Sequence, residues 1–297
     1  MLEGLYMMNA RLVEPYKGRL LEGPVWDASE MCLRFVDIKN NYLYRYTPAT
    51  QESSKLPFKE DVTFVANMDT SSLLVTTRDT IWFVDTKTGE KEIFVQFEDL
   101  SETMRFNDGG IDPYGRLWIG TMNEDEETPN AKLYVVDKSG DINVALTGLT
   151  ISNGLAWNNA GDTMYAIDTP TQKIMAYPFD EQTTTLSNGR VIYDFSNEIG
   201  NPDGMTIDAT NQLWVALWGG SRVVCIDPET QQIIDAIDVP AANVTSCAFE
   251  PGSTRLYITT ASEGLSEQQR TEQPNAGSLF VADIDVTSAP IYLFQRK

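Results

Sequence analysis

Apolar and polar residues alternate along most of this chain in short runs. The runs are rich in Val, Ile, Tyr, Phe and Trp, and Gly, Asn, Asp and Pro stand between them. Alternation with a period of two is typical of half-buried β-strands, and no stretch of helical length repeats its apolar residues with a period of 3.6. The pattern therefore predicts an all-β protein.

A repeat underlies these runs: a strand that ends near a polar residue, a tight turn, and a second strand of aromatic and aliphatic residues. Six copies align on the polar residue that opens the turn, at Asp27, Asp69, Asp112, Asn158, Asp208 and Glu250. Successive markers are 42 to 50 residues apart. In each repeat a third strand candidate follows the second strand. Four antiparallel strands in about 45 residues make a propeller blade. We therefore expect a six-bladed β-propeller with four strands per blade, because a β-sandwich would not produce a six-fold period.

The propeller should form one domain. No Gly/Ser linker, Pro-rich tract or break in composition divides the chain, so a single domain over residues 1–297 is expected. The strand candidate at residues 10–16 would complete the last blade and close the ring. The longest irregular segments, residues 123–131 and 262–277, fall between the second and third strands of their repeats, where functional lips or plain surface loops are found.

Equivalent positions of a propeller repeat lie on a ring around the central axis. The residues five positions before the markers are Glu22, Phe64, Asn107, Asn153, Asp203 and Thr245. Four of the six are carboxylates or carboxamides, whose oxygens should converge at one end of the channel. They fit a hard divalent ion, Ca²⁺ first, then Mg²⁺ or Mn²⁺, with Zn²⁺ less suited. The alternative is that Asn-Gly and Asp-Gly pairs only mark recurring turns, which leaves Glu22 unexplained.

The charge and the missing histidines narrow the chemistry. The chain has 22 Lys+Arg, 43 Asp+Glu and no His, a formal net charge of −21. Without imidazole, catalytic Ser-His-Asp and Cys-His relays are excluded. Any acid–base catalysis must therefore use carboxylates, lysine, tyrosine or metal-activated water. The negative balance argues against nucleic acid and anionic membranes as partners.

The location expected from the sequence is the cytoplasm. No apolar run approaches the length that crosses a bilayer, and the first residues lack the pattern of a secretory signal. The three cysteines, Cys32, Cys225 and Cys247, are widely spaced, which indicates reduced thiols.

Four motifs follow one another along the chain: LEGPVW around Glu22, RFNDGGIDPYGRLWIGTM at residues 105–122, ISNGLAW at 151–157 and PDGMTID at 202–208. In this order they closely resemble the senescence marker protein/gluconolactonase/luciferin-regenerating family, also called regucalcin-like. The resemblance implies a six-bladed propeller that binds one divalent cation and, in many members, hydrolyses sugar lactones.

The resemblance also implies roles for single residues. Glu22, Asn153 and Asp203 would be the metal ligands, and Arg105 and Asn107 would hold the substrate. The regucalcin-like branch has a further substrate-contacting glutamate after GTM, and by count this place falls on Asp125, a departure from the family pattern.

A lactonase of the gluconolactonase type, acting on a small sugar lactone, is therefore the leading hypothesis. We assign Asp203 a double role as metal ligand and general base, and Arg105 the binding of substrate hydroxyls or of the oxyanion. The alternative for Arg105 is a salt bridge, and Trp218 belongs either to the core or to a pocket mouth where it would stack on a sugar ring. Two other functions stay open, an esterase or organophosphate hydrolase with the same metal and a non-catalytic calcium-binding propeller.

Overall fold

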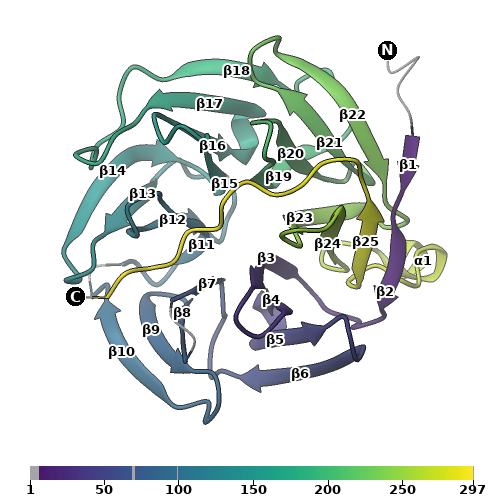
Figure 1. The fold of residues 1–297 in the computed structure, drawn as a ribbon, viewed down its shortest axis with the longest axis horizontal. Coiled ribbons are helices and arrows are strands. Elements are labelled where there is room, and N and C mark those ends of the chain that lie inside the picture. Colours follow the sequence, from purple (N-terminus) through teal and green to yellow (C-terminus); the bar gives the residue numbers. More distant parts are fainter. Residues whose placement is uncertain (1–6, 69–70, 99, 297) are drawn as a thin grey trace.

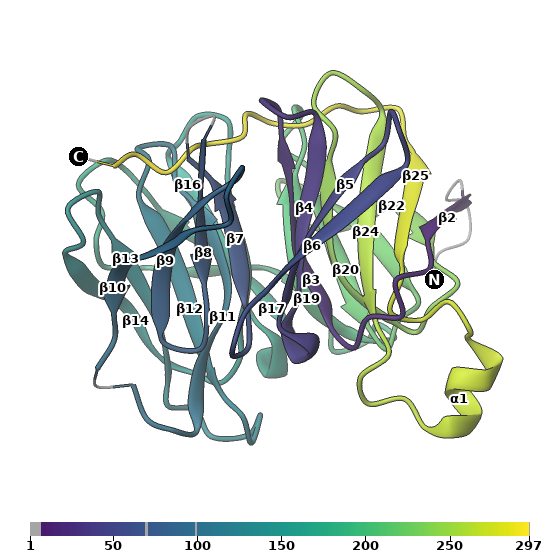
Figure 2. The same cartoon turned by 90° about the horizontal axis from the view of Figure 1, so that it is seen from below.

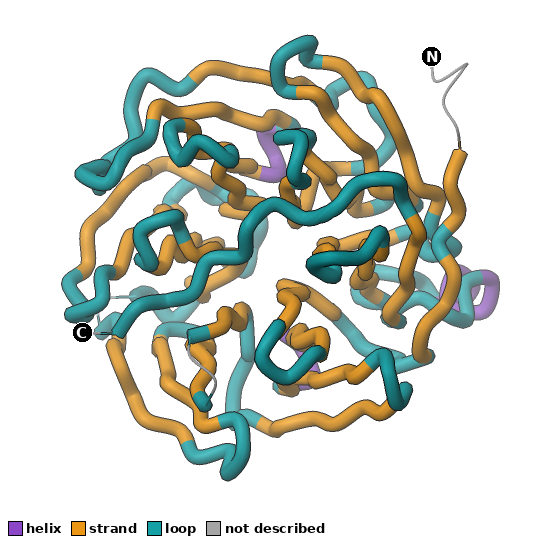
Figure 3. The backbone as a smooth tube through the Cα atoms, in the orientation of Figure 1, coloured by secondary structure: helices purple, strands orange, loops and turns teal. Residues whose placement is uncertain are grey.

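The strands form a ring of sheets around a central axis (Figure 1). The computed structural model describes residues 7–68, 71–98 and 100–296, so the turn marker Asp69 lies outside the described residues. Within this part of the chain, hydrogen bonds define four sheets of four strands and one sheet of nine. Strands make up most of the ring, and loops join successive strands (Figure 3). The expectation of an all-β propeller is confirmed.

Each four-stranded sheet consists of four consecutive antiparallel strands, with the first nearest the axis. The first sheet contains β3 (Leu21–Asp27), β4 (Cys32–Asp37), β5 (Tyr42–Thr47) and β6 (Glu52–Pro57). The second contains β7 (Phe64–Asn67), β8 (Ser72–Thr76), β9 (Thr80–Asp85) and β10 (Lys91–Gln96). The third contains β11 (Met104–Ile111), β12 (Leu117–Asn123), β13 (Ala131–Val136) and β14 (Ile142–Leu149). The fourth contains β15 (Ser152–Trp157), β16 (Thr163–Asp168), β17 (Lys173–Pro178) and β18 (Arg190–Asp194).

The nine-stranded sheet joins two units and closes the ring. One unit contains β19 (Asn201–Ile207), β20 (Leu213–Trp218), β21 (Arg222–Asp227) and β22 (Gln232–Asp238), with β1 (Met7–Asn9) parallel to β22. The other contains β23 (Asn243–Phe249), β24 (Arg255–Ala261), β25 (Leu279–Asp283) and β2 (Arg11–Glu14). One residue pair, Trp218 with Asn243, connects β20 to β23. Because β2 pairs with β25, the expected closure by an N-terminal strand is confirmed.

The aspartates that mark the repeat hold its hairpins together. The Asp112 carboxylate accepts hydrogen bonds from the backbone N–H groups two and four residues later, and from Trp118 Nε1 at 2.9 Å. Asp208 makes the equivalent bonds, including one of 2.9 Å from Trp214 Nε1. The marker thus closes the turn and also fixes a buried tryptophan of the following strand.

The core lies between neighbouring sheets. One cluster joins Ile167 and Ile174 of the fourth sheet to Val215 and Ile226 of the nine-stranded sheet. Because the sheets pack against each other on both sides, a middle strand is buried on both faces. This explains the continuous apolar run at residues 73–75 of β8, where strict alternation would have left one face polar.

The two ends of the ring differ (Figure 2). One end carries the connections between second and third strands, with the 3₁₀ turns η1 (Ile38–Asn40) and η2 (Thr169–Thr171) and the helix α1 (Glu267–Glu272). We call it the loop end. At the opposite end the C-terminal segment crosses the ring, and its buried Phe294 packs against Phe83.

Residues 262–277, expected to be irregular, contain α1. The Ser266 hydroxyl accepts a hydrogen bond from Gln269 N, and the Gln269 side chain accepts one from Ser266 N, which is a capping box. A helix of six residues is too short to show a period of 3.6, so hydrophobic periodicity could not reveal it. Among the described residues, no helix has the length and apolar character needed to cross a membrane.

Candidate functional site

Five of the innermost strands carry a β-bulge beside a polar residue. The pairing of β3, β11, β15, β19 and β23 with the next strand shifts register at, or directly after, Glu22, Asn107, Asn153, Asp203 and Thr245. In β7 the pairing is regular, and the equivalent residue is Phe64. A bulge redirects a side chain out of the alternation of its strand. The polar residues therefore face the axis as a consequence of the bulges.

The glycines that follow these polar residues lie inside strands rather than in hairpin turns. A Cβ atom added to Gly154 would come within 2.8 Å of the Asp203 carbonyl oxygen, because neighbouring innermost strands approach closely there. The recurring Asn-Gly and Asp-Gly pairs thus reflect the packing around the axis. The alternative that they mark only turns does not hold for β15 and β19.

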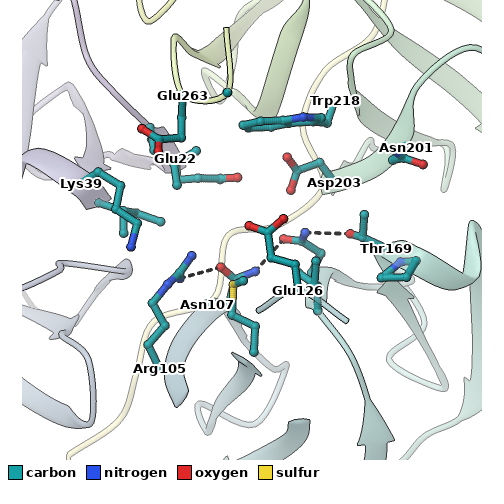
Figure 4. Close-up of a pocket in the computed structure, with 17 residues that line it drawn as sticks. Glu22, Lys39, Arg105, Asn107, Glu126, Thr169, Asn201, Asp203, Trp218 and Glu263 are labelled. Atoms are coloured by element: carbon teal, nitrogen blue, oxygen red, sulfur yellow. Dashed lines mark hydrogen bonds between the residues drawn. The ribbon is translucent and has the colours of Figure 1, made fainter. Parts of the chain in front are cut away.

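The bulges surround a cavity of about 670 Å³ at the loop end of the channel (Figure 4). Glu22, Arg105, Asn107, Asn153 and Asp203, all predicted from the sequence as site residues, line this cavity. They belong to four innermost strands. The structure thus brings together five of the six side chains that the sequence singled out.

Two buried carboxyl groups, Glu22 and Asp203, meet at the base of the cavity. Burial, followed by the charge of Asp108, raises the pKa of Glu22 to about 8. The pKa of Asp203 is raised well above its usual value by burial and then by the charges of Glu22 and Asp108. Carboxyl groups so close together without a compensating cation are costly. Their arrangement fits a divalent cation between them.

Asp108 is a residue that the sequence reasoning missed. It lies in the bulge of β11, and burial raises the pKa of its carboxyl to about 6. The signal was present in the sequence, because Asp108 directly precedes Gly109 as Glu22 precedes Gly23. A fixed offset from the turn marker selected Asn107 instead, since the bulge of β11 leaves two residues unpaired.

The carboxamide of Asn153 is held by a chain of hydrogen bonds. Its Nδ2 donates to Thr169 Oγ1 at 2.8 Å, and the Thr169 hydroxyl donates to the Pro202 carbonyl at 2.8 Å. This fixes the other end of the amide, Oδ1, on the side of Asn107, whose Nδ2 lies at 3.2 Å. Partners of this kind orient the oxygen of a metal ligand. Carboxylate and carboxamide oxygens are the donor set of a hard cation such as Ca²⁺.

Arg105 lies buried beside these oxygens, without an ion pair among the described residues. Its Nη1 donates to the Phe106 carbonyl at 2.9 Å and to Asn107 Oδ1 at 2.8 Å, and its Nε has no hydrogen-bond partner within the described chain. Burial lowers the pKa of the guanidinium. Burying a charged group with an unused hydrogen-bond donor costs free energy unless a ligand accepts that hydrogen bond. This favours the binding role of Arg105 over a structural salt bridge.

The acidic segment after β12 presents Glu126 to the cavity rather than Asp125. The exposed Asp125 carboxylate accepts hydrogen bonds from the backbone N–H groups of Glu127 and Thr128 at 2.9 Å and from the Thr128 hydroxyl. Glu124 is turned to Arg78, at 3.2 Å. Glu126, which follows both, lines the cavity, as Figure 4 shows. Counting along the sequence selected Asp125, whereas the loop directs the neighbouring Glu126 into the cavity.

A second group of ligand-type atoms, Asp27, Glu30 and Cys32, lies within 4.8 Å in the first sheet. Here the carboxylates are already paired. Arg34 Nη2 lies 2.9 Å from Asp27 Oδ2 and 3.0 Å from Glu30 Oε2, and Arg45 Nε lies 3.0 Å from Glu30. These guanidinium groups neutralise the cluster, so the cavity at the loop end is the better cation site.

This chain is similar in sequence and in fold to named proteins. The profile of the SMP-30/Gluconolactonase/LRE-like region matches residues 20–262. The Bacillus subtilis protein YvrE, provisionally named a sugar lactone lactonase, is 41% identical over 279 residues, 94% of this chain and 96% of YvrE. Regucalcin of Xenopus laevis is 32% identical over 273 residues, 90% and 91% of the two chains. The crystal structure of the calcium-binding protein regucalcin from Agrobacterium tumefaciens matches with a TM-score of 0.93 and 27% identity over 99% of both chains.

Proposed function

The chain belongs to the SMP-30/gluconolactonase/LRE-like family, and we propose that it hydrolyses sugar lactones with one divalent cation held at the loop end of the channel. The observation that carries the proposal is the meeting of Glu22 and Asp203 with Arg105 in one cavity. The oxygens suit a hard cation, and the guanidinium suits the oxygen that becomes negative in ester hydrolysis. The names of YvrE and of the regucalcins support a lactonase with Ca²⁺ as the first candidate ion, ahead of Zn²⁺, Mn²⁺ and Mg²⁺.

Each residue of the site has a role in this reaction. Glu22, Asn153 and Asp203 would hold the cation, which when bound polarises the lactone carbonyl and lowers the pKa of water. Asp203 also takes the proton of the water that attacks the carbonyl carbon. As the acyl C–O bond breaks, that proton passes to the ring oxygen, which becomes a hydroxyl of the product acid. Arg105, oriented by Asn107, stabilises the negative charge on the carbonyl oxygen.

The lining of the cavity separates this function from its alternatives. Glu126, Glu263 and Asn201 supply acceptors and donors for sugar hydroxyls, whereas an apolar ester or phosphotriester would leave these groups without partners. A protein that only binds calcium needs no buried arginine with an unused donor beside the ion. Both features favour hydrolysis of a hydroxylated lactone.

We further propose that the ring counts as six blades in a single domain over residues 1–297. The nine-stranded sheet then divides into two blades, β19 to β22 and β23 to β25 with β2. The support is that, among the described residues, strand pairing joins the two units through the single pair Trp218 and Asn243. The first unit has four consecutive strands like the other four sheets, and in the second β2 takes the place of the fourth strand.

Acid release from a panel of lactones tests the proposed function. The purified protein with Ca²⁺ should hydrolyse D-glucono-1,5-lactone and other aldonolactones faster than the spontaneous reaction, as measured with a pH indicator. An aryl ester and a phosphotriester serve as competitors of other classes. A higher kcat/KM for either of these would favour the esterase or organophosphate hydrolase. Calcium binding without turnover of any substrate would favour the non-catalytic propeller.

Paired substitutions in the acidic loop test which carboxylate meets the substrate. Glu126→Gln should raise KM for glucono-1,5-lactone about tenfold, since a hydrogen bond to a charged acceptor contributes about 1.5 kcal/mol or more. Asp125→Asn should change KM about twofold or less, because the amide oxygen can still accept the backbone bonds of the turn. Steady-state kinetics of both variants decides the question. A larger effect of Asp125→Asn would return the contact to Asp125.

A further inference from the structure

Trp218 differs from the other tryptophans of the chain. Trp26, Trp118, Trp157 and Trp214 are nearly fully buried and belong to core clusters. Trp82 is half-buried, packs against a core cluster and donates its Nε1 proton to Thr77 at 2.9 Å. Trp218 is also half-buried. Within the described residues, however, it belongs to no core cluster, contacts no other aromatic ring, and its indole N–H donates no hydrogen bond. A large aromatic side chain without a role in the core is available for a ligand.

The backbone places Trp218 at the wall of the cavity. It is the last residue of β20, and its position in β20 opposite Asn201 of β19 sets it on the loop end of the channel. Gly219 follows with a φ of 75°, so the chain turns away directly after the tryptophan. A Cβ atom added to Gly264 would lie 3.8 Å from Trp218 Cζ2, so the edge of the indole meets the backbone of that loop. Figure 4 shows the ring above Asp203 on the wall across from Arg105 and Lys39.

Hydrogen-bond acceptors stand around this aromatic surface. Glu263, beside Trp218, is held by Arg19, whose Nε and Nη2 donate to its carboxylate at 2.9 and 3.0 Å. That carboxylate keeps lone pairs for further donors. Glu126 reaches in from the other side of the cavity, as Figure 4 shows. A flat aromatic face bordered by carboxylates matches a sugar ring, which has polarised C–H groups on its face and hydroxyl groups at its edge.

We propose that Trp218 is the stacking surface for the C–H face of the lactone ring and makes the site selective for hydroxylated rings over plain aliphatic lactones. This inference rests on the proposed function and identifies the part of the cavity that distinguishes one class of substrate from another. The indole would contact the C–H groups of the ring, whose charge changes little during hydrolysis, so its contribution is nearly equal in the ground state and the transition state. Loss of the indole should therefore change KM much more than kcat.

Two variants and a matched control test the inference. Trp218→Phe keeps an aromatic face, Trp218→Leu keeps only apolar area, and Trp82→Leu removes a half-buried tryptophan outside the cavity. Glucono-1,5-lactone is compared with δ-valerolactone, which has the same ring without hydroxyl groups. Trp218→Leu should raise KM for the sugar lactone about tenfold, with kcat changed about threefold or less. Trp218→Phe should lie between Trp218→Leu and the wild type. The kinetics of δ-valerolactone in both variants, and all kinetics of Trp82→Leu, should stay within about twofold of the wild type.

A binding measurement separates this inference from the proposed function. 1,5-Anhydro-D-glucitol has the sugar ring without the carbonyl, and its binding should change the tryptophan fluorescence of the wild type and of Trp82→Leu but not of Trp218→Phe. Its Kd should rise about tenfold in Trp218→Leu. Binding with this pattern but without lactone turnover would support the role of Trp218 and refute the lactonase. Turnover of glucono-1,5-lactone with KM and Kd unchanged in Trp218→Leu would overturn the inference and leave the lactonase standing.

Discussion

Replacing Asp203 by asparagine should lower kcat for glucono-1,5-lactone by about 10²- to 10⁴-fold, the range typical for loss of a general base. The carboxamide has nearly the same shape, so the innermost strand β19 and its bulge should be retained. The amide cannot take a proton from water at neutral pH. Its oxygen could still act as a ligand, the role proposed for the carboxamide oxygen of Asn153 in the neighbouring strand. Steady-state kinetics together with the metal content of the variant measures both roles of the residue.

The exposed Asp194, on β18 and outside the cavity, provides a matched control. Asp194→Asn should leave kcat within about twofold of the wild type, since surface substitutions of this kind have small effects. Loss of activity in Asp203→Asn with the cation still bound would assign the residue to proton transfer. Loss of both would assign it to holding the ion. A rate equal to that of the wild type would remove Asp203 from the mechanism.

The propeller fold and the ring of side chains that face its axis could be predicted because the same sequence pattern recurs in every repeat. Each copy contains the turn marker, and Asp112 shows the physical reason, since one carboxylate closes the turn and fixes a tryptophan of the next strand. Equivalent positions of a closed ring must face the axis. Glu22, Asn153 and Asp203 could therefore be found without coordinates. The repeat did not define where the sheets connect, as the link between β20 and β23 rests on one residue pair.

The residues that were missed depend on local geometry that the repeat does not determine. Asp108 needs the bulge of β11, which leaves both Asn107 and Asp108 unpaired. Glu126 needs the loop conformation, set by the ion pair of Glu124 with Arg78 and by the turn that Asp125 closes. No count along the sequence fixes which of three neighbouring acidic side chains points inward. Trp218 was not missed, but the sequence left the core and the pocket mouth open for it, and the turn at Gly219 places it at the cavity.

Removing divalent metal should lower the lactonase activity at least about 100-fold, because a bound cation contributes several kcal/mol to stabilising the transition state of ester hydrolysis. The same treatment should lower the melting temperature. Without a cation, burial, followed by the charge of Asp108, keeps the pKa of Glu22 at about 8, far above its usual value. A carboxyl group whose pKa is raised in the folded state stabilises the fold fully at pH values below about 4.5, and this contribution is lost as pH rises through about 8.

Protons and a divalent cation compete for the same carboxyl groups, and this competition sets the sign of the pH dependence of stability. At pH 6 protons relieve the repulsion between Glu22 and Asp203, so chelator should change the melting temperature little. At pH 8.5 only a cation can relieve it, so chelator should lower the melting temperature by several degrees, about 2–4 °C per kcal/mol of lost binding. Glu22→Gln removes one charge and should abolish this difference between the two pH values, which calorimetry with and without Ca²⁺ would detect. Equal activity and equal melting temperature after complete metal removal at pH 8.5 would show that these carboxyl groups hold no functional ion.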